Sequence, residues 1–244
     1  VFARVATFVF AAPFFSQKGV PNQVKIGLSV FVAYLMYAFV QPHTYPEYST
    51  VFGYSVIIAK EVAVGLFLGA GAQLCTSIVL FAGRIMDMEI GLSMANVFDP
   101  TTNQQSSITG VFLHYGVMLI LYATGLHRYL LSALKETFTL IPIGGAVFHM
   151  DNLLTTVVSF LSDYIVIGFR ICLPVFASIM LMNIVLALLA KLAPQMNMFS
   201  VGIQLKLLAG LGVLVLAISM LPNVCNFITT KMQQMVVSMV KGLM

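Results

Sequence analysis

Charged residues are scarce in this chain, because Asp, Glu, Lys and Arg make up only 8% of its 244 residues. An ordinary soluble domain carries about 25%. Apolar residues make up 60%, and the mean hydropathy is +1.00. So few polar groups cannot cover a water-exposed surface of this size, which excludes a soluble monomer and also a disordered chain. The chain must therefore lie in lipid or be buried against other apolar chains.

The usual signatures of catalysis, metal binding and nucleic-acid binding are also missing. The sequence contains no H-E-x-x-H, no G-x-S-x-G, no Walker loop and no G-x-G-x-x-G. Its three cysteines lie far apart within apolar stretches, and its four histidines share no metal-ligand spacing. The 12 basic residues are scattered singly, without the basic runs that follow nucleic-acid phosphates. We therefore predict no catalytic residue, no metal site, no cofactor and no nucleic-acid partner.

Long intervals without Asp, Glu, Lys or Arg mark the candidate membrane spans, since a helix needs about 20 apolar residues to cross the hydrocarbon. Continuous apolar runs favour helices over a barrel, whose strands alternate. The sequence therefore predicts an all-α, membrane-class chain with about six long apolar helical segments. The candidate spans are residues 1–15 (interrupted by Arg4), 26–46, 62–83, the apolar part of 100–127, 171–190 and 207–230.

Two helical patterns are too long for a plain bundle of membrane spans. They run from residue 51 to about residue 96 and from residue 152 to about residue 190. At 1.5 Å per residue these would measure roughly 70 and 58 Å, against a hydrocarbon slab of about 30 Å. Either each stretch breaks, with Pro174 or the glycines near Gly65 as weak points, or the protein is not a simple bundle. Gly65 and Gly69 also match the small-x-x-x-small pattern, which marks either a close helix contact or a chance match.

Five ionisable residues lie in or beside these apolar runs, where an unpaired charge is costly. Lys60 and Glu61 are adjacent and point in different directions on a helix, so each needs a partner elsewhere. Arg84 and Asp87 lie three residues apart and can pair locally. Arg170 lies between two apolar runs. A proton path and structural pairing between helices or subunits are both consistent with such residues; we favour pairing, since no chain of acids continues inward.

The stretch 96–107 is the longest uncharged polar segment, with Asp99 as its one ionic residue and Pro100 blocking a helix. An ordinary surface connection and a gate would both explain it.

Three blocks of residues resemble the FliR family of flagellar type III export-gate proteins. The first block contains Ala-Pro-Phe-Phe-Ser at 12–16 and Val-Lys-Ile-Gly-Leu at 24–28. The second contains Met-Glu-Ile-Gly-Leu-Ser at 88–93, Phe-Asp-Pro at 98–100 and Ile-Pro-Ile-Gly at 141–144. The third is Leu-Ala-Pro-Gln-Met-Asn-Met-Phe at 192–199. The blocks follow in the family's order, although residues 202–204 read Gly-Ile-Gln where the family commonly has Gly-Phe-Pro.

The resemblance implies a single integrated domain, residues 1–244, folded as helical hairpins within a helical ring. One copy of the chain would close that ring with several copies of the export-gate P and Q subunits and would contact the switch protein FlhB. The ring would form the entrance pore for unfolded export substrates, in the bacterial inner membrane at the flagellar basal body. An autonomous small-solute transporter or channel, and a homologue from a virulence injectisome, are the alternatives.

The family's loop after the third helical stretch projects into the pore as a plug, and the resemblance places that role on one segment of this chain. The implied plug residues are Met94, Asn96, Val97, Phe98, Asp99, Pro100, Thr101, Thr102, Asn103, Gln104, Gln105 and Ser106.

Overall fold

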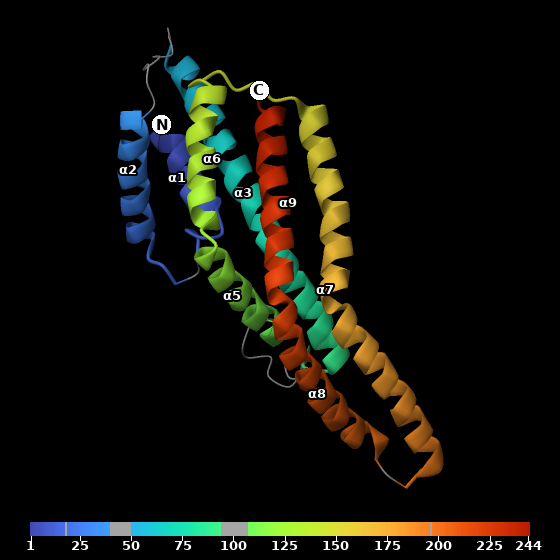
Figure 1. The fold of residues 1–244 in the computed structure, drawn as a ribbon. Helices are drawn as coiled ribbons and strands as arrows, with labels where there is room; N and C mark the ends of the chain where they lie inside the picture. The colour runs from blue at the N-terminus through green and yellow to red at the C-terminus, as the bar shows by residue number, and fades with distance from the viewer. Residues whose placement is uncertain (18, 40–49, 94–106, 196) are drawn as a thin grey trace. The chain divides into compact units, whose positions relative to one another are not determined.

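The computed structural model describes residues 1–17, 19–39, 50–93, 107–195 and 197–244, and every regular element in these ranges is a helix (Figure 1). The predicted all-α fold class is therefore confirmed. The chain divides into two compact units, each assembled from segments that are far apart in the sequence. The prediction of one integrated domain over residues 1–244 stays a prediction.

The first unit consists of residues Val1–Thr76, Leu121–Ser162 and Ile228–Met244. Its core includes the inner face of α1, where Val5, Phe8 and Val9 are at most 2% exposed. The helix α1 packs on α2 (Figure 1), which turns only a narrow stripe inward. The elements of this unit are α1 (Phe2–Ala11), α2 (Asn22–Phe39), the beginning of α3 (Val51–Ile90), α6 (Leu126–Leu140), the beginning of α7 (Met150–Leu192) and most of α9 (Leu221–Gly242).

Two glycines of α3 let the backbone of α1 approach closely. A Cβ at Gly65 would collide with the carbonyl oxygen of Arg4 and with Oγ1 of Thr7. A Cβ at Gly69 would lie 2.6 Å from Cβ of Ala11, again an impossible approach. The small-x-x-x-small pattern thus marks a real helix contact.

The C-terminal end of α9 is tied to the segment that precedes α7. The Val147 N–H donates to the Leu243 carbonyl at 3.2 Å, and the His149 N–H donates to the Gly242 carbonyl at 3.0 Å. Leu243 itself is fully buried. Carbonyls at a helix C-terminus lack intrahelical donors, so this pairing satisfies groups that would otherwise need water.

The second unit consists of residues Ser77–Ile120 and Asp163–Phe227. Here too glycine allows close contact, because a Cβ at Gly83 of α3 would collide with the backbone of Gly110 in α5. The Phe81 and Tyr164 rings lie 5.2 Å apart between centroids, and the Tyr164 hydroxyl donates to the Ser77 carbonyl. The elements of this unit are the end of α3, most of α5 (Ile108–Ala123), the remainder of α7, α8 (Met198–Ala217), the 3₁₀ turn η1 (Ile218–Met220) and the start of α9.

Neither of the two long helical stretches breaks. The helix α3 runs for 40 residues and α7 for 43 residues, with Pro174 inside α7. At 1.5 Å per residue they measure about 60 and 65 Å, roughly twice the hydrocarbon thickness. The sequence left two alternatives: that each stretch breaks, or that the protein is not a simple bundle of membrane spans. Because both helices are continuous, the second alternative holds. The glycines at 65 and 69 serve helix contact.

Three stretches of the described chain are long and apolar enough to cross a membrane: residues 51–90, 150–192 and 200–242. Helices α5 and α6, bent by 67° at their junction, make a fourth if counted as one span. The sequence predicted six such intervals, and the difference lies in the two N-terminal ones, residues 1–15 and 26–46. Of the second, residues 40–46 lie outside the described residues. In this N-terminal part, α1 has 10 residues, and α2 has 18 that include Asn22 and Lys25 near its start.

Candidate functional site

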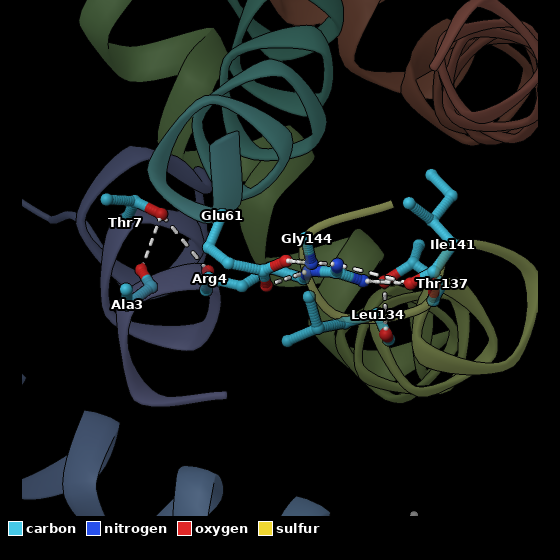
Figure 2. Close-up of polar contacts among 8 residues, drawn as sticks. All are labelled: Ala3, Arg4, Thr7, Glu61, Leu134, Thr137, Ile141 and Gly144. Atoms are coloured by element: carbon cyan, nitrogen blue, oxygen red, sulfur yellow. Dashed lines mark hydrogen bonds and ion pairs between the residues drawn. The ribbon is translucent and has the colours of Figure 1, made fainter. Parts of the chain in front are cut away.

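The central polar feature of the first unit is a buried ion pair between Arg4 of α1 and Glu61 of α3 (Figure 2). Nε of Arg4 donates to Oε2 of Glu61 at 2.8 Å, and Nη2 donates to Oε1 at 2.9 Å. The Arg4 side chain is 0% exposed and that of Glu61 is 4% exposed. Such two-point contact is the strongest arrangement between a guanidinium and a carboxylate, and it fixes both side chains in orientation.

The remaining donors of Arg4 bind backbone carbonyls at the end of α6. Nη1 donates to the Thr137 carbonyl at 2.9 Å, and both Nη1 and Nη2 donate to the Ile141 carbonyl at 3.2 Å. The guanidinium carbon also lies 4.4 Å from the centre of the Phe138 ring. All five N–H groups of the guanidinium therefore have acceptors, which is the condition for burying a charge of this kind.

Glu61 connects the pair to the loop that follows α6. The Gly144 N–H donates to Oε1 of Glu61 at 3.0 Å, and Gly144 takes a positive φ of 80°, which glycine adopts freely. The neighbouring Lys60 donates from Nζ to the Gly144 carbonyl at 3.4 Å. One network thus joins α1, α3, the C-terminus of α6 and the loop after it, as Figure 2 shows.

In the second unit, Asp87 of α3 caps the beginning of α5. Its Oδ1 accepts a hydrogen bond from the Thr109 N–H at 3.2 Å, and Asp87 is 4% exposed. A carboxylate at a helix N-terminus satisfies a free N–H and interacts favourably with the helix dipole. Arg84 lies exposed on the same helix, and the described part of the chain holds no ion pair between Arg84 and Asp87.

Of the five residues predicted for structural pairing, the structure brings Lys60 and Glu61 into one network and leaves Arg84, Asp87 and Arg170 outside it. Arg170 is exposed, on the wall of an apolar pocket. Sequence reasoning missed Arg4 as the partner of Glu61. The available signal was that Arg4 is the single charge in an otherwise apolar N-terminal segment and opposite in sign to Glu61.

The implied plug residues, from Met94 to Ser106, lie outside the described residues. Among the residues that are described, no group of three or more His, Cys, Asp or Glu side chains is placed to hold a metal ion. The Arg4–Glu61 network holds helices in position, since every N–H donor of the Arg4 guanidinium is already occupied.

Fold and network together define a helical, membrane-class protein whose internal charges anchor its own helices. The chain belongs to the family described as bacterial export proteins, family 1, which matches residues 1–232. This confirms the family indicated by the three sequence blocks.

Several curated relatives carry the name flagellar biosynthetic protein FliR. The protein of Bacillus subtilis strain 168 is 29% identical over 223 residues, which cover 91% of this chain and 85% of the relative. That of Buchnera aphidicola from Acyrthosiphon pisum is 29% identical over 208 residues, covering 85% and 80%. That of Escherichia coli K12 is 24% identical over 240 residues, covering 98% and 91%. The similarity therefore extends over nearly the whole chain.

Proposed function

We propose that this chain is a non-enzymatic core subunit of the flagellar type III export gate, which helps to form and plug the entrance pore for unfolded export substrates. The observation that carries the proposal is the export-family match over residues 1–232. The relatives' names support the flagellar system over an injectisome. The same reasoning puts the chain in the bacterial inner membrane, at the flagellar basal body.

The apolar surface that this chain leaves uncovered supports a place among several partner chains. In the most apolar stretches of α7 and of residues 200–242, only 17% and 11% of residues are buried within the chain. Obligate interfaces between subunits are large and hydrophobic, and such surfaces supply them. We propose the P and Q subunits of the gate as these partners, with one copy of this chain, and the switch protein FlhB as a further contact.

The assembly is tested by extracting the tagged chain in mild detergent together with its genomic neighbours and measuring the native mass. We expect a complex with several partner chains. A stable single chain that moves small solutes across liposomes when reconstituted alone would instead support an autonomous transporter.

The biological role is tested in the host strain by deleting the gene and restoring it from a plasmid. We expect loss of motility and loss of flagellar protein secretion, both recovered with the intact gene. Normal motility with loss of secreted virulence proteins would support an injectisome subunit and contradict the flagellar assignment.

A further inference from the structure

A pocket of about 200 Å³ opens in the second unit beside the middle of α7. Its walls are almost entirely apolar, with side chains such as Ile171, Met220 and Phe227. Its two polar wall residues are Arg170 and Asn223, both exposed. Small-molecule sites usually measure about 300–1,000 Å³ and enclose their ligand. This smaller, open pocket suits one or two side chains that project from a neighbouring surface.

Arg170 has no ion-pair or hydrogen-bond partner for its side chain among the residues that the structure describes. It lies in an apolar setting, since Val166, Phe169 and Leu173 on the same helix are each about half exposed. A guanidinium on an apolar, membrane-class helix is expensive without an anionic partner, so such residues pair with other groups. The described residues supply no anionic oxygen to Arg170, so its charge is open to a partner.

The backbone around the pocket favours protein over lipid as the cover of this face. Pro174, in the pocket wall, has no N–H, so the Arg170 carbonyl four residues earlier lacks its helical donor. Across the pocket, the 3₁₀ turn η1 interrupts the helical path between α8 and α9, and Met220 of that turn lines the same wall. In a membrane helix, a carbonyl freed by proline is satisfied by a neighbouring helix, a side chain, ordered water or a local 3₁₀ adjustment, and lipid tails offer no such donor.

We propose that an apolar helix of a partner subunit docks on this pocket, inserts one or two apolar side chains into it, and presents a carboxylate to Arg170. Charge complementarity sets the chemistry of the partner: one Asp or Glu within an otherwise apolar helix, flanked by residues of Leu or Phe size. The proposal rests on the proposed function, from which the partner chains come. It assigns those partners a docking face on this chain.

The test compares variants of the tagged chain, expressed with its genomic neighbours and extracted in mild detergent. We expect Arg170→Met to retain at least tenfold less partner chain, Arg170→Glu to retain none, and Arg170→Lys to retain an intermediate amount. The matched control is Lys191→Met, which removes an exposed charge from the end of the same helix and leaves retention unchanged. Equal recovery of the tagged chain itself, with unchanged helical circular dichroism, shows that the variants fold.

Two further measurements identify the occupant. In the Arg170→Glu background, changing each Asp or Glu in the partners' apolar helices to Arg should restore retention at one position. A photo-crosslinking residue in place of Asn223 should link to the same partner helix. Wild-type retention in Arg170→Met and Arg170→Glu would overturn the proposal, as would a phospholipid as the crosslinked species. A wild-type chain that purifies alone would overturn the proposed function itself.

Discussion

Replacing Glu61 by leucine should destabilise the first unit more than any exposed charge substitution. The change removes both carboxylate oxygens from a guanidinium that is 0% exposed, and it removes the acceptor of the Gly144 N–H. Removing one partner of a buried ion pair costs about 3–5 kcal/mol, because the other charge stays buried without compensation. At 1.4 kcal/mol per factor of ten, this shifts the folding equilibrium on the order of 10² to 10⁴-fold.

The destabilisation by Glu61→Leu comes from the Arg4–Glu61 ion pair, and a double-mutant cycle isolates the contribution of that pair. Arg4→Met combined with Glu61→Leu replaces both charges by apolar side chains, a change that is often neutral for a buried pair. Here recovery should be partial, because the Ile141 carbonyl loses its donors at about 1–3 kcal/mol for a group left unsatisfied, whereas the Thr137 carbonyl keeps the Ile141 N–H. The double variant should thus be more stable than the sum of the two single changes predicts.

The assay is the midpoint temperature of unfolding of the purified protein in mild detergent. For a chain of this size, each kcal/mol shifts the midpoint by roughly 2–4 °C, so Glu61→Leu should lower it by about 6–20 °C. The control is Glu136→Leu, an exposed glutamate on α6, which should change stability by less than about 0.5 kcal/mol. A Glu61→Leu midpoint equal to the control's, or strictly additive single and double variants, would refute the reasoning.

Three other changes test separate contacts. Gly65→Leu should prevent α1 from docking on α3 and expose α1 to protease. Gly212→Leu is the control, since a Cβ there would meet open space, and it should leave α1 protected. Equal protection of α1 in both variants would contradict the close helix approach. Asp87→Ala should cost about 0.5–2 kcal/mol through loss of the α5 cap, seen as a lower unfolding midpoint that Asp87→Asn largely restores. Deleting residues 101–106 should leave assembly intact and make the membrane leaky to small ions; unchanged permeability in assembled complexes would show that this segment is a connection and not a plug.

The sequence predicted the helical class and the long apolar stretches, because each depends on local composition or spacing. It left open whether Gly65 and Gly69 mark a helix contact, which the packing of α1 on α3 decides. Pro174 was ambiguous, since a proline can break a helix or bend it, and only packing on the rest of the second unit decides between these outcomes. The partner of Glu61 could not be predicted from the sequence, for a different reason. Arg4 lies 57 residues earlier in the chain, and no periodicity relates two helices so far apart. The cap that Asp87 provides for α5 is likewise a contact between helices, which spacing along one helix cannot reveal.

The interleaving of the two units has a consequence for synthesis. Residues 1–76, 121–162 and 228–244 form one unit, and the intervening segments form the other. Arg4 therefore emerges from the ribosome long before the α6 carbonyls that it binds, and residues 147–149 emerge long before their acceptors at 242–243. Contacts so distant in sequence form slowly, and until they form, the nascent chain carries an uncompensated arginine and unpaired backbone groups. The first unit cannot close until the second has been completely translated, so a chain whose synthesis stops before residue 228 would have no finished first unit to offer to a partner.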